Sequence, residues 1–436
     1  MTSKFTSMAR VAGSALLLAG FVSACSKDDI LRPDTPDVIT PDKLETPEGQ
    51  ASRFAGAVSD IVFATTGGTG LVLFGGMFTD ELMHASTPPA VREWDLRGVL
   101  ATNSVASGGA GPFLALQRAR TALEGAARVL PANDPRTGEM YALAGLSYIM
   151  FGEMFCSGTP ISERDPAVSL GTPFTTAQLF TRAIERLTTA ASNTGGDARI
   201  TNLIAVLRGR TLLNQGQFAQ AATAVAAVPT NYVYNFIHAA PPARQSNQIQ
   251  LNTASDIYSV PDREGTNGMP FASAADPRIP LTSTGPSRND GVTPMVVQKK
   301  YPVIDSPVEM ATGVEARLIE AEAALQATNV SLWLQKLNDA RATVAALTPL
   351  TDPGTQTARV DLTFRERAFW MYLTGHRLGD LRRLVRQYSR AEESVYPTGA
   401  YHKQGLTRGG QAALIVPQPE ENNSNYKASD CTVDTP

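Results

Sequence analysis

The chain has 436 residues, of which 43% are hydrophobic and 18% are charged, enough apolar material for a large core. Its formal net charge is −3, and its basic residues are scattered rather than gathered into the stripe typical of nucleic-acid-binding proteins. The densest basic cluster, formed by Arg382, Arg383 and Arg386, is predicted to lie on a solvated helix face.

The first 24 residues have the pattern of a bacterial signal peptide. Lys4 and Arg10 precede an apolar run over residues 11–22, which is shorter than the roughly 20 residues that a membrane-spanning helix needs. Small residues then lead into Cys25, and this resembles the bacterial lipobox, in which the cysteine is lipidated and the chain is cut just before it. We therefore expect residues 1–24 to be removed. An ordinary signal peptide with an incidental cysteine is the alternative.

Residues 25–48 are expected to be a lipid anchor and a flexible tether, because they are rich in Asp, Pro and Thr and poor in apolar residues. The stretch Ser26-Lys27-Asp28-Asp29 resembles the tag that sends Bacteroidetes-type lipoproteins to the cell surface. No later stretch of the sequence looks apolar enough to span a membrane, so the acyl chains on Cys25 are the expected attachment.

Two cysteines remain once Cys25 is assigned to lipid, and an even pair in an exported protein can form a disulfide. We predict a bridge between Cys156 and Cys431, which would tie the end of the chain to an early helix hairpin. Two unpaired thiols are the alternative.

The first part of the body is predicted to be helical, with apolar residues recurring every three or four positions. The expected helices cover about residues 50–64, 113–130, 138–155 and 175–191. Residues 65–111 interrupt them with loops and short helix. Residues 200–228 indicate a helix hairpin, in which Gly209, Gly216 and neighbouring apolar residues fall near tetratricopeptide spacing. Small residues at these positions would let two antiparallel helices approach closely.

Helical periodicity stops at about residues 231–310, where Pro, Gly, Asn and Ser dominate. A segment this long is unusual as a structureless loop, so we expect an ordered, loop-rich cap with a few short strands. Helices are predicted to resume over 314–327, 331–347 and 361–386, and a loop-rich tail to cover 391–436.

Several motifs in this second half resemble, in their order, those of the SusD/RagB family of outer-membrane nutrient-uptake lipoproteins. The motifs are Asp276-Pro277-Arg278, Lys299-Lys300-Tyr301, Arg317 to Ala323, Leu337 to Ala342, Glu366-Arg367 with Gly375-His376-Arg377 and Asp380 to Arg383, and Ile415 to Glu420 with Asn425. The sequence departs from the family pattern at Trp370, Thr374 and Leu378, which indicates a divergent branch. The charges between Glu366 and Arg383 are predicted to hold helices together rather than to take part in catalysis.

The resemblance implies a mostly α fold, a tetratricopeptide-like superhelix of helix hairpins with a loop-rich cap. On this basis residues 49–436 form one SusD-like domain, with repeat helices at about 49–228 and 314–386. The resemblance further implies a surface-exposed, lipid-anchored outer-membrane protein. It would capture an oligosaccharide, or a peptide, and deliver it to a SusC-like TonB-dependent transporter.

In the family, ligands contact loops beside the repeat scaffold. By that analogy, the ligand-binding candidates are Trp94, Asp95, Tyr232, Tyr234 and Tyr258. Each of them could instead be a core residue that anchors a loop. A helical-repeat scaffold or assembly lipoprotein that binds protein partners is the alternative function, although the cap argues against it.

No catalytic or cofactor motif stands out in the sequence. The four histidines are far apart and lack zinc-ligand spacing, and Gly67-Gly68-Thr69-Gly70 lacks the lysine of a phosphate-binding loop. The acidic pair Asp80-Glu81 could serve a glycosidase, but a solvated or capping pair is the simpler interpretation. We therefore expect a binding protein that is not an enzyme and that needs neither a metal nor a cofactor.

Overall fold

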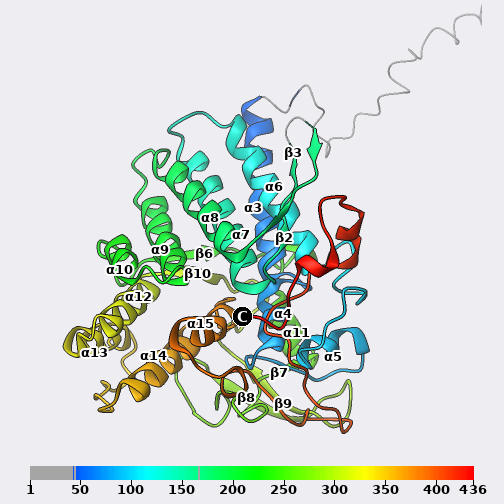
Figure 1. Ribbon diagram of the computed structural model, residues 1–436, viewed down its shortest axis with the longest axis vertical. Coiled ribbons are helices and arrows are strands. Elements are labelled where there is room, and N and C mark those ends of the chain that lie inside the picture. Colours follow the sequence, from blue (N-terminus) through cyan, green and yellow to red (C-terminus); the bar gives the residue numbers. More distant parts are fainter. Residues whose placement is uncertain (1–42, 44–45, 165–166) are drawn as a thin grey trace, which may run out of the picture. The chain divides into compact units, whose positions relative to one another are not determined.

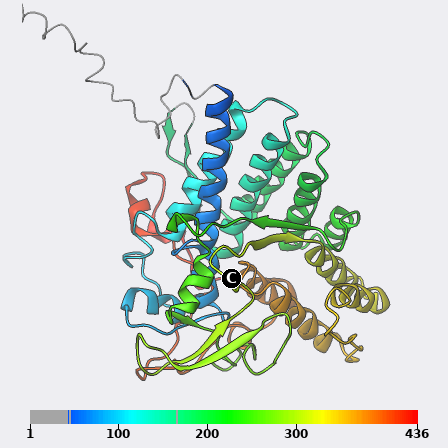
Figure 2. The ribbon, with the colours of Figure 1, turned by 180° about the vertical axis from the view of Figure 1, so that it is seen from behind.

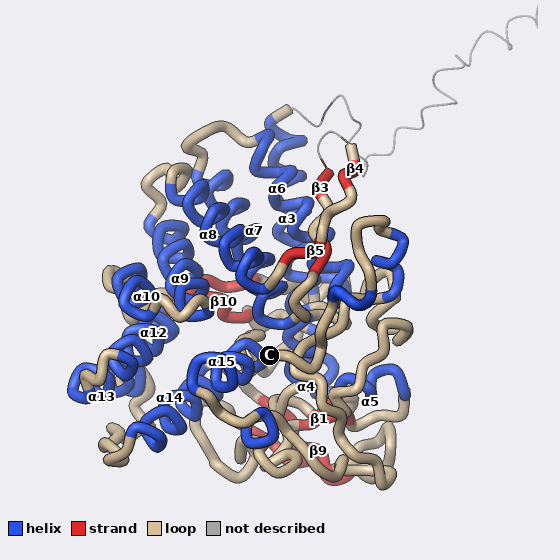
Figure 3. The backbone as a smooth tube through the Cα atoms, viewed as in Figure 1, coloured by secondary structure: helices blue, strands red, loops and turns tan. Residues whose placement is uncertain are grey.

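The computed structural model describes residues 43, 46–164 and 167–436. The predicted signal peptide and Cys25 lie outside the described residues. Residues Gln50–Pro436 form one compact unit. Within it, helices dominate and the strands are short, as Figure 3 shows. The prediction of a mostly α, tetratricopeptide-like fold with a loop-rich cap is confirmed.

The helices of the first group lie side by side (Figure 1), and those from α6 to α10 pack as consecutive hairpins. The group consists of α3 (Pro47–Thr66), α6 (Pro112–Val129), α7 (Pro135–Met154), α8 (Thr176–Ala191), α9 (Ala198–Asn214) and α10 (Phe218–Val225). Helix α8 begins with a capping box, in which Thr175 and Gln178 each bond the other's backbone N–H. Helix α7 is almost entirely buried, because it packs against α6, α8 and α9.

Close approach in the α9–α10 hairpin depends on Gly209, as the tetratricopeptide-like spacing predicts. A Cβ atom at Gly209 would lie 2.5 Å from Val225 Cγ1, closer than carbon atoms can pack. The two helices therefore meet at a distance that only a glycine permits at this position.

The second group of helices follows the cap. It consists of α12 (Gly313–Gln326), α13 (Val330–Arg341), α14 (Gln356–Trp370) and α15 (Arg377–Tyr388). Helices α12 and α13 pack as a hairpin, and α10 packs on α12, so this group continues the first one. Helix α15 packs against α7 and α4 (Leu71–Phe78), which places it at the centre of the fold.

Two of these helices differ from the predictions. The expected helix over 361–386 is broken between α14 and α15, because Leu373 and Gly375 take positive φ angles of 52° and 76°. The helix expected over 331–347 ends at Arg341, whose side chain bonds the carbonyl of Thr348 in the following loop.

The cap holds short antiparallel strands, as predicted. Its strands are β6 (Val233–Phe236), β7 (Tyr258–Ser259), β8 (Leu281–Pro286), β9 (Pro294–Gln298) and β10 (Val308–Thr312), which form the pairs β6–β10 and β8–β9. Strand β7 pairs with β1 (Met83–His84), which precedes the cap in the chain. The β6–β10 pair is seen in Figure 2, which shows the molecule from behind. A short helix, α11 (Gln248–Ala254), lies between β6 and β7.

Smaller elements complete the first half of the chain. Helix α5 (Pro89–Asp95) follows β1, and the strands β2 (Thr159–Pro160), β3 (Glu163–Arg164), β4 (Val168–Ser169) and β5 (Pro173–Phe174) form the pairs β2–β5 and β3–β4. The segment predicted as loops and short helix, residues 65–111, thus contains α4, β1 and α5.

The arginine cluster predicted to be solvated is largely buried. Arg382 and Arg383 are each 1% exposed. Arg382 donates to the carbonyls of Gly152 and Phe155 at the end of α7, and Arg383 pairs with Asp380 at 2.8 Å. The prediction was wrong because the apolar pattern of α15 does not reveal that its basic face meets acceptors from other helices.

One segment beyond the signal peptide is long and apolar enough to cross a membrane by composition, contrary to our expectation. It covers Pro47–Phe78, and its most apolar 18-residue window has a mean hydropathy of 1.6. In its most apolar window, 83% of the residues are buried within the described fold. This burial is that of a core helix of a globular domain.

The two cysteines predicted to pair are joined in the structure. The Cys156 and Cys431 sulfur atoms lie 1.97 Å apart, and 275 residues separate them in sequence. Backbone bridges between Phe155 and Leu414 and between Ser157 and Thr432 run alongside the disulfide. The C-terminal tail is therefore attached to the end of α7.

Candidate ligand-binding site

A cavity of about 620 Å³ opens between the cap and the C-terminal tail. We call it the cap–tail cavity. Its wall combines apolar residues with side chains that carry hydroxyl, carboxylate, imidazole and guanidinium groups. These residues are Met83, Val260, Pro261, Asp262, Arg263, Glu264, Gly265, Thr266, Ala272, Pro294, Val296, Thr398, Ala400, His402 and Arg408. A volume of this size suits a small ligand or a few sugar rings.

Two strand contacts form the cap side of the cavity. Strand β1 pairs with β7, and beyond β7 the amide of Val260 donates to the carbonyl of Val296 in β9 at 2.8 Å. The hydroxyl of Ser259 also donates to the carbonyl of Pro294, at 2.7 Å. The loop that follows Val260 is thus held against β9 and carries its side chains into the cavity wall.

The tail side of the cavity is a small hairpin. The amide of Arg408 donates to the carbonyl of Gly399, and the amide of Tyr401 donates to the carbonyl of Leu406. Helix α5 fixes this hairpin, since the next amide in the chain, that of Gly409, donates to the carbonyl of Leu96 at 2.7 Å. Segments that are far apart in the sequence therefore meet at this site.

Three buried ionisable residues lie together at the cavity, Glu264 and Arg408 in its wall and Asp95 behind it, and we call them the Glu264 cluster. The Arg408 guanidinium bonds Glu264 Oε1 and also lies 3.4 Å from Asp95 Oδ1. Asp95 Oδ2 accepts further bonds from the Tyr401 hydroxyl and from the amide of His84, both at 2.7 Å. Burial and the neighbouring Asp95 raise the pKa of Glu264 well above its usual range.

Two histidines flank the Glu264 cluster. The side chain of His402 is 19% exposed, and its Nδ1 lies 3.8 Å from Glu264 Oε1. His84 is fully buried, and burial together with Lys403 lowers its pKa to about 4. The pKa of His402 is also lowered, mainly by burial. Both shifts favour the neutral form of the ring near pH 7.

Donor atoms of Asp95, Glu264 and His402 lie within 4.8 Å of one another, a grouping that could hold a metal ion. The Arg408 guanidinium already binds both carboxylates of this group. A divalent cation would therefore be placed beside a fixed positive charge, which disfavours metal binding at these residues.

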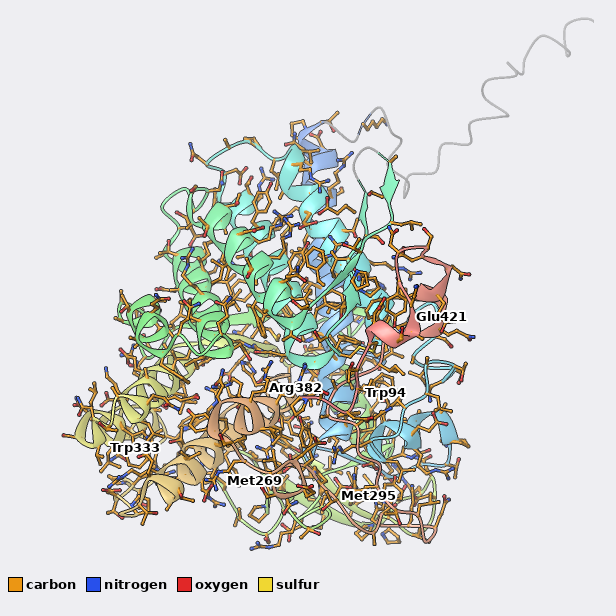
Figure 4. The ribbon with its side chains drawn as sticks, in the orientation of Figure 1. Trp94, Met269, Met295, Trp333, Arg382 and Glu421 are labelled. Atoms are coloured by element: carbon orange, nitrogen blue, oxygen red, sulfur yellow. A yellow bond between two sulfur atoms is a disulfide. The ribbon has the colours of Figure 1, made fainter. Side chains whose placement is uncertain are left out.

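Of the five ligand-binding candidates from the sequence, only Asp95 belongs to this site, where it lies behind the wall and holds Arg408. The others are buried in the core. Trp94 packs edge-on against Phe74 of α4 and is labelled in Figure 4. The Tyr232 hydroxyl donates to the carbonyl of Arg199.

Tyr234 and Tyr258 are also core residues. The Tyr234 hydroxyl donates to Glu139 Oε1 at 2.5 Å, and Tyr258 is only 3% exposed. The ligand-binding role expected for Trp94 and the three tyrosines is therefore corrected. Their rings anchor the cap to the helices and leave no face open to a ligand.

The charged motifs that resemble SusD/RagB proteins contact one another inside the fold. Arg278 of the Asp-Pro-Arg motif pairs with Glu366 at 2.7 Å, and Arg341 pairs with the same carboxylate at 2.8 Å. Lys300 donates to the carbonyl of Tyr372. These motifs hold the cap on the second group of helices, as predicted for charges that bind helices together.

Arg377 and Asp380 stand three residues apart in α15, and each pairs with a residue from another part of the chain. Arg377 pairs with Asp80 at 2.7 Å, and Asp380 pairs with Arg367 at 2.8 Å. The acidic pair Asp80-Glu81 is buried rather than solvated, since Asp80 holds Arg377 and Glu81 Oε1 accepts the amide of Leu373.

Sequence reasoning missed Arg263, Glu264, His402 and Arg408. Each comes from a loop, and no periodicity or spacing marks them. The only available signal was their place in the cap and in the tail, the two loop-rich segments, which on this scaffold fold against each other.

Comparisons with known proteins bear on the fold. No protein-family model matches the sequence. No curated protein matches it either. Solved structures do match. A SusD-like protein from Bacteroides fragilis is 13% identical, covers 92% of this chain and 99% of its own, and superposes with a TM-score of 0.64.

Two further structures agree with this match. A SusD superfamily protein from Parabacteroides distasonis is 11% identical, with a TM-score of 0.65 over 87% of this chain and 98% of its own. A SusD-like carbohydrate-binding protein from Bacteroides vulgatus is 14% identical, with a TM-score of 0.54 over 77% of this chain and 82% of its own. The chain therefore has the SusD fold.

Proposed function

We propose that this protein binds glycans, without catalysing a reaction, in the cap–tail cavity. The observation that carries the proposal is a cavity of about 620 Å³ with mixed polar and apolar walls on a SusD fold. Sugar rings present both hydroxyls and C–H faces, and the wall offers partners for both. A structure of the same fold from Bacteroides vulgatus is described as a carbohydrate-binding protein, which supports this choice over a peptide ligand.

A substitution that fills the cavity tests the site. Ala400 lines the cavity and is exposed, so Ala400→Trp should occupy the space without disturbing the Glu264 cluster. Glycan-array binding of the purified full chain, followed by calorimetry on the best glycan, should give an affinity that Ala400→Trp lowers at least about tenfold, the equivalent of 1.4 kcal/mol.

The matched control is Ala219→Trp, on the open groove between α10 and α12. It should leave glycan binding unchanged. If no glycan binds, or if only the control variant loses binding, the proposed site is wrong. Retained binding of a protein partner alone would favour the scaffold function instead.

The proposal extends to the cell envelope. A lipid on Cys25 would attach the protein to the outer membrane, facing the cell surface, and the captured glycan would pass to a SusC-like TonB-dependent transporter. The sequence before residue 49 and the SusD fold support this arrangement. Detergent extraction of the outer membrane should recover the protein together with a β-barrel transporter. A Cys25→Ala variant should leave the membrane fraction, and its retention there would contradict lipid anchoring.

A further inference from the structure

One side of the cap–tail cavity is aliphatic. Pro294 and Val296 stand two positions apart in β9, so their side chains lie on the same face of the strand. Met83 of β1 and Val260, which follows β7, line the cavity beside them. We call these four residues the aliphatic wall.

The backbone of β9 behind the aliphatic wall has already made its hydrogen bonds. The amide of Val296 donates to the Ser259 hydroxyl at 2.9 Å, and Pro294 has no amide hydrogen to donate. The carbonyl of Pro294 accepts from the Ser259 hydroxyl at 2.7 Å, and that of Val296 accepts from the Val260 amide at 2.8 Å. A ligand hydroxyl held here would find no free donor among these groups and would lose its bonds to water.

The cavity also lacks aromatic walls. Among the residues that the structure describes, no Phe, Tyr or Trp side chain lines it. A sugar ring therefore has no flat aromatic face to stack on. The apolar part of a ligand that fits this wall is a small, rounded group such as a methyl, which packs well against branched aliphatic side chains.

The carboxylates and guanidinium groups around the cavity balance one another. Glu264 holds its proton near neutral pH, because burial and Asp95 raise its pKa well above the usual range. The guanidinium of Arg408 then faces the charge of Asp95, 3.4 Å away. At the rim, the exposed side chains of Asp262 and Arg263 carry opposite charges. A charged ligand group would therefore leave water without gaining an unbalanced partner.

We propose that the cap–tail cavity selects uncharged glycans that contain a 6-deoxyhexose, and that the C6 methyl group of this sugar packs against the aliphatic wall. This inference rests on the proposed glycan-binding function and specifies its ligand. The remaining hydroxyls of the sugar would meet the polar part of the cavity, which includes Thr266 and Thr398.

A methyl group bonded directly to the sugar ring suits this wall better than the methyl of an acetamido group. An acetamido group brings an N–H and a carbonyl next to its methyl, and both need hydrogen-bond partners when they are buried. The backbone of β9 has no free amide to give that carbonyl, because the Val296 amide is bonded to Ser259.

Oligosaccharides that differ only at C6 of one terminal sugar test the inference by calorimetry on the full chain. Each set has a methyl, a hydroxymethyl or a carboxylate group at that carbon. The methyl member should bind about tenfold to a hundredfold more tightly than the hydroxymethyl member, the range expected when an aliphatic pocket discriminates against an added hydroxyl. The carboxylate member should bind most weakly, because it carries a charge into a balanced site.

Val296→Thr tests the wall itself. Threonine has nearly the shape of valine and suits a strand, but it places a hydroxyl in the wall. The variant should lower the preference for the methyl member at least about threefold. The matched control is Val292→Thr, the same substitution in the turn between β8 and β9, where Val292 is 65% exposed and does not line the cavity. It should leave the preference unchanged.

Several outcomes would overturn the inference while the glycan-binding function stands. They are equal or tighter binding of the hydroxymethyl or carboxylate members, and tight binding confined to N-acetylated sugars. A preference for the methyl member that Ala400→Trp leaves intact would place the selective site outside this cavity, and would also overturn it. Absence of binding to every glycan would overturn both the inference and the proposed function.

Discussion

Buried charged residues of this protein form ion pairs that link its helices. Arg210 and Glu153 illustrate this, because both are buried and their side chains form two parallel hydrogen bonds between α9 and α7. Arg383 and Arg377 of α15 are also paired with residues from other elements, Glu322 of α12 and Asp80. Removing one member of such a pair leaves a buried charge without a partner, which commonly costs about 3–5 kcal/mol.

Glu81 is a buried carboxyl whose ionisation should make stability depend on pH. Burial raises its pKa from the ordinary 4.5 to about 8. Because the folded state holds this proton more tightly, the stabilisation is complete below pH 4.5 and is lost as the pH rises through about 8.

Glu81→Gln should remove this dependence, since glutamine keeps the oxygen that accepts the amide of Leu373. Urea unfolding at pH 5 and pH 9 should show wild-type stability falling relative to the variant by several kcal/mol, at about 1.4 kcal/mol per pKa unit. A constant difference between the two proteins across this range would contradict the assignment.

At the scale of elements, the packing of each helix hairpin depends on how closely the axes of its two helices approach. The α9–α10 hairpin is the clearest case, because the place of a Cβ at Gly209 is already occupied by Val225. The hairpin also contacts the second group of helices, because α10 packs on α12. A small change of spacing here would be passed on to the second group of helices.

Gly209→Ala should therefore destabilise the protein, although alanine is the better helix former by about 1 kcal/mol. The clash with Val225 should cost about 1–3 kcal/mol and outweigh that gain. Chemical denaturation measures the balance. The matched control is Gly125→Ala in α6, where a Cβ would meet nothing within 4 Å, and it should stabilise by about 0.5–1 kcal/mol. Equal effects at the two glycines would refute close packing at Gly209.

At the scale of the whole domain, the chain's last segment closes the structure. The tail returns from α15 to the end of α7, where the disulfide between Cys156 and Cys431 holds it. On the way, its hairpin forms one wall of the cap–tail cavity through Thr398, His402 and Arg408. The wall of the proposed site is therefore complete only when the tail lies against the cap.

Loss of the disulfide should weaken both the attachment of the tail and the proposed site. The double variant Cys156→Ala/Cys431→Ala should lose about 2–4 kcal/mol of stability, because the bridge closes a long loop. Its tail should also become more susceptible to limited proteolysis. A reducing agent should lower the stability of the wild type by a similar amount and leave the double variant unchanged. If both proteins respond equally to the reductant, the bridge is not the cause.

The sequence by itself determined the elements of this protein. Periodicity placed most helices to within a few residues, and the tetratricopeptide-like spacing identified Gly209 as a point of close approach. These features are local, because they depend on residues three or four positions apart along one helix. The loop-rich cap was evident from the composition of the segment. The cysteine pair was evident because two cysteines remain once Cys25 is assigned to lipid.

Only the tertiary structure decided which loops meet. Asp95, Glu264 and Arg408 lie on three segments more than a hundred residues apart, and of the three only Asp95 was a candidate from the sequence. The same reason explains the errors, since Trp94 and the cap tyrosines looked available in loops but pack into the core. Burial and ion pairing are properties of contacts between distant segments, and those contacts exist only once the helices have stacked.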